Sequence, residues 1–311
     1  MILLFLTAAV VPTCATCHPV EAKSQASTAM KRALTPARDS AILKANPNLQ
    51  YRSGNYRWSI TREAGEPVYS VTDGSRRVSA KLQWAFGVGT MGQTYVYEQN
   101  GALYESTLSY YTLTKSLDFT PGHLDRPRRN IDEAAGRLID SAEVRRCFNC
   151  HANNATEPVT TGVQCEHCHA GAATHAASHS KMIRLSQATA EEISNLCGAC
   201  HRTWEDIAVN GPKSVQNIRF QPYRLANSKC YDAADRRISC TACHDPHAAT
   251  IRQSTSYDAK CLNCHAQGKV CRVGRQDCVT CHMPKTEIPG IHFAFTDHWI
   301  RVTHAGEPYP Q

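Results

Sequence analysis

The pattern Cys-x-x-Cys-His constrains this chain more than any other feature, because it occurs seven times in 311 residues. Six copies lie between Cys147 and His282, and the seventh lies alone near the N-terminus. With Cys and His each at roughly one residue in twenty, chance predicts about 0.04 copies in such a chain. This spacing is that of a c-type haem attachment site, in which two thiols bind the vinyl groups of one porphyrin and the adjoining His binds its iron.

We therefore predict seven covalent haem c groups. Their thioether cysteines are Cys14, Cys17, Cys147, Cys150, Cys165, Cys168, Cys197, Cys200, Cys240, Cys243, Cys261, Cys264, Cys278 and Cys281. Their proximal ligands are His18, His151, His169, His201, His244, His265 and His282. Structural zinc is the main alternative, but zinc needs four ligands and does not explain a His directly after every Cys pair. A redox dithiol also fits poorly, because such motifs occur singly.

The density of the motifs predicts how the haems are arranged. Between the second and the last motif there is one haem for roughly every 23 residues, which is too little chain to enclose each ring separately. Leu, Ile, Val and Phe are sparse and the apolar fraction is 42%, so the porphyrins themselves would form much of the core. We expect the rings to contact one another and to form a continuous path for electrons.

The net charge of +7 does not indicate a nucleic-acid partner. Each haem adds two propionates, and each ferric porphyrin core adds one positive charge, so the oxidised holoprotein comes to about zero net charge. No interleaving of aromatic and basic residues favours nucleic-acid binding either.

The chain divides by composition into four parts. Residues 1–13 form a leader-like apolar segment that is too short to span a bilayer and lacks a basic n-region. Residues 14–50 contain the first haem motif, residues 51–122 a β-rich insert, and residues 123–311 a six-haem domain. We expect a mainly α or irregular multihaem cytochrome c fold with a haem-stacked core. Regular secondary structure should be scarce, and the insert should form a small antiparallel β module.

Two local signals are specific enough to predict individual elements. Asn100-Gly101 lies between two runs that alternate in the strand period, which predicts a β-hairpin. Thr189 with Glu192 three residues later forms a capping-box sequence, which predicts a helix over residues 190–196 leading into Cys197.

Histidines outside the attachment motifs are candidates for the distal axial ligands. His167 lies between the cysteines of its own motif and is poorly placed to reach another iron. The other seven candidates are His123, His175, His179, His247, His292, His298 and His304. His247 is the strongest, because Pro246 fixes a turn after His244 that directs a second imidazole away from the first. Bis-histidine iron is low-spin and suited to electron transfer, whereas five-coordinate iron would be open to substrate.

Two cysteines, Cys230 and Cys271, lie outside the motifs. Haem c is attached outside the cytoplasm, and an even pair of cysteines in an oxidising compartment indicates a disulfide. The alternative is two unrelated buried thiols.

Several segments in and around the motifs resemble a known family. They are Cys14–His18 followed by Thr28-Ala-Met30, residues 87–95, Thr120-Pro-Gly122, Cys165–His169 with His175 and His179 behind it, Cys240–His247, Cys278–Lys285, and Phe295–His298. They resemble the multihaem c-type cytochromes related to the tetrahaem cytochrome that accepts electrons from hydroxylamine oxidation in nitrifiers, and more closely its larger bacterial relatives. The chain departs from that family at Ala170-Gly-Ala, which replaces Gly-Pro-Gly, and at His123, where relatives have an aromatic residue.

The resemblance implies roles that the residues alone do not give. The segment with His175 and His179 would supply the distal ligand of the first haem. Met30, for which core packing is otherwise favoured, would supply a distal ligand to the haem at Cys165 and raise its potential. The haem bound by Cys147, Cys150 and His151 would correspond to a five-coordinate one and is the candidate for an open site.

The combined expectation is an exported cytochrome, periplasmic or extracellular, that transfers electrons through seven closely packed haems. Its partners would be redox proteins or extracellular electron acceptors. One alternative is an oxidoreductase acting on a small nitrogen or sulfur species at an open haem. Another is a subunit of a cytochrome filament, in which a terminal His such as His304 binds a neighbour's haem.

Overall fold

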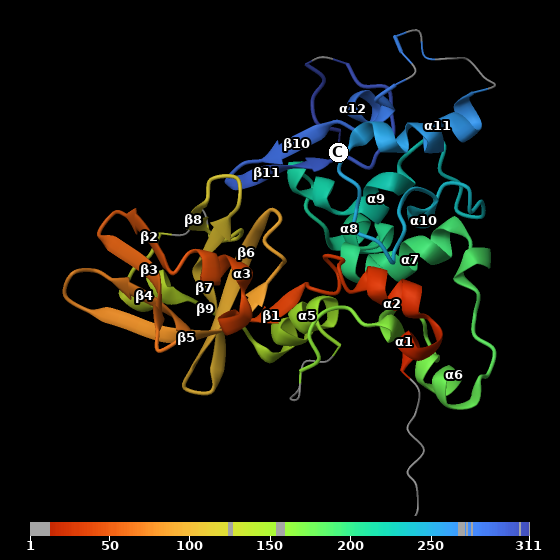
Figure 1. The fold of residues 1–311 in the computed structure, drawn as a ribbon. Coiled ribbons are helices and arrows are strands. Elements are labelled where there is room, and N and C mark those ends of the chain that lie inside the picture. Colours follow the sequence, from red (N-terminus) through yellow and green to blue (C-terminus); the bar gives the residue numbers. More distant parts are fainter. Residues whose placement is uncertain are drawn as a thin grey trace, which may run out of the picture.

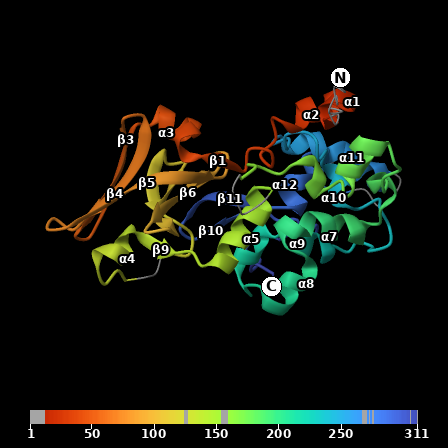
Figure 2. The same cartoon turned by 90° about the horizontal axis from the view of Figure 1, so that it is seen from below.

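The computed structural model describes residues 13–123, 127–153, 159–266, 271, 273–274, 276–304 and 306–310. Within these residues the chain forms a β-rich lobe and a helical lobe that lie side by side (Figure 1), and the view from below shows the same division (Figure 2). Nearly all of the predicted leader-like segment, residues 1–13, lies outside the described residues. No helix in the described ranges is long and apolar enough to cross a membrane.

The β-rich lobe is one antiparallel sheet of nine strands within the described residues. The strands are β1 (Leu34–Pro36), β2 (Asn48–Ser53), β3 (Tyr56–Glu63), β4 (Glu66–Thr72), β5 (Arg77–Phe86), β6 (Gly92–Gln99), β7 (Ala102–Tyr111), β8 (Ser116–Phe119) and β9 (Gly136–Leu138). Strands β2 to β8 pair in chain order, while β1 pairs with β5 and β9 with β7. The two ends of this order meet, since the Tyr51 hydroxyl on β2 donates to Asp118 on β8 at 2.8 Å. The sheet is therefore a nearly closed barrel.

The predicted fold class, a mainly α or irregular chain with a small β module, is wrong. The sheet recruits strands from both sides of the predicted insert: Leu34 pairs with Phe86, and Leu138 pairs with Tyr104. These short strands form only because the partner strand is present, and strand periodicity in a window of sequence does not detect such long-range pairing. The barrel also has its own core, in which Trp58, Tyr69, Tyr95 and Leu108 are almost fully buried.

Both local predictions are confirmed. Strands β6 and β7 form a hairpin in which Gln99 pairs with Ala102, and Asn100 and Gly101 both have positive φ, as a tight type I′ turn requires. The helix predicted from the capping box begins at Ala190. Its first turn is held by the reciprocal bonds of Thr189 and Glu192, at 3.2 Å and 2.7 Å.

The helical lobe consists of short helices joined by irregular segments. Its helices are α1 (Cys14–Cys17), α2 (Pro19–Gln25), α5 (Ser141–His151), α6 (Ala172–Ser178), α7 (Ala190–His201), α8 (Trp204–Asn210), α9 (Gln221–Ala226), α10 (Cys240–Cys243), α11 (Asp258–His265) and α12 (Cys278–His282). Two further helices, α3 (Ala41–Ala45) and α4 (Ile131–Ala135), pack against the sheet. The N-terminal helices α1 and α2 thus lie with the later motifs rather than with the sheet that follows them (Figure 1).

A two-stranded hairpin, β10 (Lys285–Ile288) and β11 (Ile291–Thr296), links the helical lobe to the sheet (Figure 1). Its Ile288 and Ile291 pack with Tyr111 of β7 and with Ile218 of the helical lobe. His292 on β11 adds a hydrogen bond to Asp118 on β8 at 2.6 Å. The C-terminal segment is thereby fixed against both lobes.

Candidate haem-binding site

All seven attachment motifs lie in the described part of the chain, and six of them lie in α-helices or end one. In α5, α7, α11 and α12 the helix ends at the motif histidine, while α1 and α10 comprise the two cysteines and the residues between them. A helix places positions i and i+3 on one face, so the two thiols of each of these motifs point the same way. The third motif begins instead as a 3-10 turn over Cys165–His167.

Thiols of different motifs lie close to one another. Side-chain contacts join Cys14 with Cys165, Cys150 with Cys200, Cys197 with Cys240, and Cys261 with Cys278. Cys168 is close enough to Cys197 and Cys200 to affect their pKa values, as Cys261 is for Cys243. Every motif therefore adjoins at least one other. The order in space is first, third, fourth, fifth, sixth, seventh, with the second motif branching from the fourth.

Three proximal histidines face a histidine from elsewhere in the chain. The ring centroids are 6.4 Å apart for His18 and His175, 5.9 Å for His169 and His247, and 6.3 Å for His244 and His298. A metal–imidazole bond is about 2 Å long and the ring centre lies about 1 Å beyond the nitrogen, so two imidazoles on opposite faces of one iron have centroids about 6 Å apart. The centroid distances of all three pairs match this value.

Backbone carbonyls orient several of these imidazoles. The Nδ1 atoms of His175, His282 and His298 bond the carbonyls of Ser180, Arg301 and Thr296 at 2.6, 2.8 and 3.0 Å. An Nδ1–H donor in such a bond leaves Nε2 free as the metal-binding nitrogen and fixes the direction of the ring.

The carbonyl of Ala33, next to β1, orients the imidazole of the second motif. It accepts a bond from Nδ1 of His151 at 3.0 Å, and it also accepts the backbone N–H of Gly87 at 2.7 Å. Gly87 directly follows β5, so this imidazole is fixed from the edge of the sheet.

Burial keeps the candidate ligands neutral. It lowers the pKa of His151, His169, His201 and His244, and it lowers the pKa of His298 to about 4. Neutral imidazole is the form that binds a metal, so these side chains are ready to act as ligands near neutral pH.

Two predicted distal ligands have other partners. The His292 imidazole bonds Asp118 and packs edge-on against Tyr111, with centroids 4.8 Å apart. His123 is buried and bonds Glu105 at 3.1 Å, and Glu105 also accepts from Arg137 at 2.7 Å. The His292 bond joins the C-terminal hairpin to the sheet, the His123 bond joins the segment after β8 to β7, and neither ring faces a proximal histidine.

Met30, His179 and His304 lie beside motifs without facing a proximal imidazole. The Met30 carbonyl accepts from the N–H of Val163, two residues before the third motif, whereas the ring opposite His169 belongs to His247. His179 ends α6 in the left-handed region, and its N–H bonds the His175 carbonyl. The neighbour of His304, Thr303, bonds the Cys281 carbonyl.

Four proximal histidines, His151, His201, His265 and His282, have no imidazole ring opposite them within the described ranges. Phe86 packs edge-on against His151 with centroids 5.1 Å apart. The candidate open site at Cys147, Cys150 and His151 therefore has no second histidine among the described residues.

The remaining predicted residues behave as follows. Both ring nitrogens of His167 bond backbone groups, of Gln164 and Ala152, so its role is structural. All the cysteines lie among the described residues and are free thiols in the structure, so the predicted disulfide between Cys230 and Cys271 is not formed there. Both of these thiols are exposed. In the described residues no three His, Cys, Asp or Glu side chains converge as a zinc site would require.

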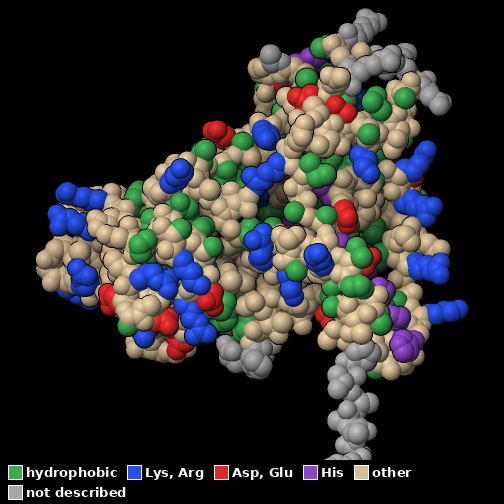
Figure 3. Space-filling model, viewed as in Figure 1, with side chains coloured by type: hydrophobic (Ala, Val, Ile, Leu, Met, Phe, Trp, Pro, Cys, Tyr) green, Lys and Arg blue, Asp and Glu red, His purple; other side chains and the backbone are tan. Residues whose placement is uncertain are grey.

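The packing of the helical lobe fits large covalent rings. Three clusters of buried apolar side chains are described: one in the barrel, one where α5 meets β1 and one under the C-terminal hairpin, and residues 165–282 contribute only Ile218 to them. The chain exposes 19350 Å², whereas a folded protein of its mass exposes about 13,000 Å². Figure 3 shows hydrophobic side chains on the surface of this lobe, and a hollow beside histidines on the side where the lobe meets the β-rich lobe.

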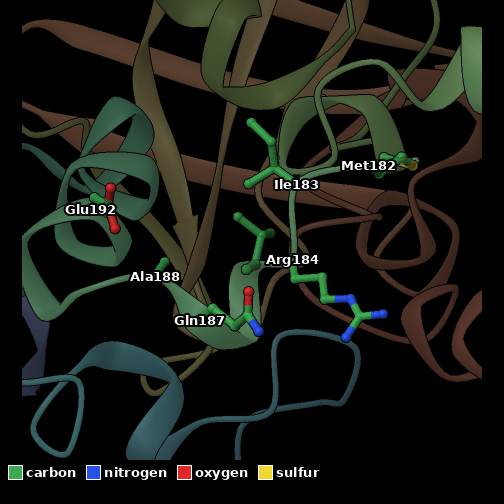
Figure 4. A pocket seen from close by; sticks show the side chains of 7 residues that line it. Met182, Ile183, Arg184, Gln187, Ala188 and Glu192 are labelled. Carbon is green, nitrogen blue, oxygen red and sulfur yellow. The ribbon is translucent and has the colours of Figure 1, made fainter. Parts of the chain in front are cut away.

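An open groove of about 600 Å³ runs along the segment that joins α6 to α7. Ile183, Arg184 and Glu192 line it, and their side chains point in different directions (Figure 4). None of its lining residues belongs to a motif or to a facing histidine pair, so we assign no ligand to it.

Sequence reasoning missed Arg224, Asp297 and the carbonyl of Ala33. Arg224 and Asp297 form a fully buried bidentate ion pair, with both N–O distances at 2.8 Å. The only sequence signal was the position of Asp297 directly before His298. No sequence signal identifies a carbonyl that orients a ligand.

Comparisons with known proteins support the same type of site. Residues 233–270, which contain the fifth and sixth motifs, match the family model described as the doubled CXXCH motif. No curated protein matches the sequence. Among solved structures the chain is similar to one described as the crystal structure of outer cell wall cytochrome OcwA. The TM-score is 0.53 at 12% identity, covering 93% of this chain and 78% of that chain.

Proposed function

Because the doubled motif and the shared fold indicate a multihaem c-type cytochrome, we propose that this chain transfers electrons through seven covalent haem c groups. Three of them, at the first, third and fifth motifs, are bis-histidine centres with His175, His247 and His298 as distal ligands. The spacing of these three ring pairs is the observation that carries the proposal, because each pair fits one iron and closes it to substrate.

The contacts between motif thiols support one continuous route. Neighbouring thiols bring neighbouring porphyrin edges together, since each thiol is bonded to the edge of its ring. The route runs through the first, third, fourth, fifth, sixth and seventh motifs, and the fourth motif is the junction from which the second branches.

Bound haem supplies a redox-active iron, and its potential depends on axial ligands, burial and hydrogen bonding. The chain provides each of these controls. The surroundings of His298 lower its pKa to about 4, whereas the side chain of His247 is 37% exposed, which would place two bis-histidine centres in different surroundings. Backbone carbonyls at Ser180, Thr296 and Arg301 hold the rings in direction and raise their basicity.

We propose that the protein is exported, because haem c is attached outside the cytoplasm and the structurally similar protein is described as an outer cell wall cytochrome. Its partners would then be redox proteins or extracellular electron acceptors. The second cysteines of the first, fifth, sixth and seventh motifs are exposed, which would bring porphyrin edges within reach of such partners.

Removing single haems tests the route. One variant replaces Cys197 and Cys200 by Ser to remove the junction haem, and a matched variant replaces Cys278 and Cys281 to remove a terminal one. Flash photoreduction places a few electrons at random among the haems, and absorbance follows their redistribution. We expect one fast phase in the wild type and in the terminal variant, and a fraction of slowly equilibrating electrons in the junction variant.

Two results would contradict the proposal. A purified, exported wild type whose mass shows far fewer than seven haems would remove its basis. Equal redistribution kinetics in the two variants, with six haems attached in each, would refute the junction at the fourth motif.

A second function, binding of a small molecule at the second motif, is favoured by one observation. His151 has no imidazole opposite it among the described residues, and Phe86 lies edge-on beside it. Cyanide or nitric oxide should then bind the haem of the second motif in the wild type. A variant that lacks the second motif's haem should lose this binding.

A further inference from the structure

We infer that the buried ion pair of Arg224 and Asp297 positions the axial ligands of two haems, at the fifth and the seventh motifs. The inference rests on the proposed haem function. It concerns residues outside every motif, and it makes one carboxylate responsible for the ligand geometry of two centres.

The ion pair is the most enclosed charged group described in the helical lobe. Both side chains are fully buried, and Arg224 donates Nε and Nη2 to the two carboxylate oxygens of Asp297 at 2.8 Å each. Arg224 Nη1 also donates to the Pro310 carbonyl at 3.0 Å, and its guanidinium lies over the rings of Trp299 and Tyr309. Helix α9 and the C-terminal segment are thus joined in a single orientation.

The Asp297 carboxylate organises the turn that follows it. Its Oδ1 accepts the N–H of Trp299 at 3.0 Å, and its Oδ2 accepts Nη1 of Arg301 at 2.7 Å. A carboxylate that bonds residues two and four positions later fixes the backbone between them. His298 is the first residue of that turn.

The fixed turn places His298 opposite the fifth motif. Its ring lies 6.3 Å from that of His244, and its Nδ1 bonds the Thr296 carbonyl at 3.0 Å. The Ser228 hydroxyl, two residues after α9, accepts the N–H of Ile300 at 2.8 Å. A shift of the turn would therefore move the distal ligand away from its iron.

The same turn orients the proximal ligand of the seventh motif. The Arg301 carbonyl bonds Nδ1 of His282 at 2.8 Å, and the Arg301 N–H donates to the His282 carbonyl at 3.2 Å. Because the Arg301 side chain is held by Asp297, the direction of the His282 ring depends on the ion pair as well. One network thus connects ligands of two different centres.

A buried ion pair is weak evidence of stability, because its desolvation cost offsets much of its attraction. The ion pair instead sets the orientation of the turn after Asp297, because two parallel hydrogen bonds restrict that orientation more than apolar packing would. A positioning role and a merely structural role therefore make different predictions for a variant that keeps the fold.

Asp297→Asn in the intact holoprotein tests the inference, with low-spin haem counted by EPR and near-infrared magnetic circular dichroism. We expect the low-spin signal of the fifth-motif haem to fall, the spectrum of the seventh-motif haem to change, and both midpoint potentials to shift. Asp118→Asn is the matched control, because it makes the same substitution at a carboxylate that bonds the hairpin. Asp118 lies on β8 and bonds His292 of β11, and His292 faces no motif histidine. This substitution should leave the spectrum unchanged.

Asp297→Asn leaves the Arg224 charge buried without its partner and could unfold the protein. The double variant Arg224→Met with Asp297→Leu is therefore a second test, since it leaves no unpaired charge buried. If the role is positioning, this variant keeps its seven haems and its melting temperature but shows the same two-haem change. A wild-type spectrum in both variants with all haems attached would overturn the inference, as would an equal change at every haem. A wild type without low-spin haem would instead refute the proposed function.

Discussion

His247→Ala tests the ligand assignment on which sequence resemblance and structure differ. The resemblance implies Met30 as the distal ligand of the third motif, whereas the ring of His247 lies 5.9 Å from that of His169 with the planes 5° apart. Two imidazoles bound to opposite faces of one iron have centroids about 6 Å apart, which matches this distance. We therefore expect His247, and not Met30, to bind this iron.

The size of the effect follows from the number of bis-histidine centres. Loss of His247 leaves one iron with a single axial imidazole, which converts it from low spin to high spin. With three facing histidine pairs, loss of one corresponds to about one-third of the low-spin signal that these centres give. EPR of the oxidised holoprotein integrates this signal, and mass spectrometry confirms that seven haems remain attached.

Two single substitutions serve as controls. Met30→Leu should leave the low-spin signal unchanged, and so should His292→Ala, because the His292 imidazole bonds Asp118 and not an iron. The reasoning would be refuted if Met30→Leu removed one haem's share of the signal while His247→Ala removed none. It would also be refuted if His292→Ala had the same effect as His247→Ala.

Three further predictions concern the fold. Leu108→Ala, at a fully buried barrel position, should destabilise the sheet by about 2–5 kcal/mol. Urea unfolding followed by tyrosine and tryptophan fluorescence measures this, and no change in midpoint would contradict the barrel core. Thr189→Ala should cost about 1 kcal/mol through loss of the helix cap, and Thr189→Ser should restore most of it. Burial alone would raise the pKa of Asp118, but bonds from the Phe119 N–H, His292 and Tyr51 lower it below the ordinary 3.8. The stability that Asp118 contributes is therefore present above pH 3.8 and is lost as the pH falls through its lower folded value. The melting temperature of the wild type, measured at decreasing pH, should show this loss. The same dependence of melting temperature on pH in Asp118→Asn would contradict the prediction.

Local chemistry made part of this structure predictable. Each attachment motif, the Asn100-Gly101 turn and the Thr189 cap follow from interactions within a few residues, so their sequence patterns are sufficient. His175, His247 and His298 were also among the distal candidates, because few other histidines were available.

The features of the fold and the site that the sequence did not predict depend on contacts between distant segments. Strand β9 exists because Gly136–Leu138 meets β7, more than twenty residues earlier in the chain, and no periodicity in three residues indicates a strand. The roles of His123 and His292 could not be separated from those of ligands, because a histidine that bonds Glu105 or Asp118 has no distinct sequence pattern. Such roles depend on the partner that the fold supplies.

The carbonyl of Ala33 has a consequence for maturation. The barrel buries its own side chains, so it can fold before any porphyrin is attached, and the Gly87 bond then fixes the Ala33 carbonyl in place. On the proposed function, His151 would find its orienting acceptor already formed before its haem is attached. Haem attachment would thus begin with one prepared centre, held beside a sheet that is already folded.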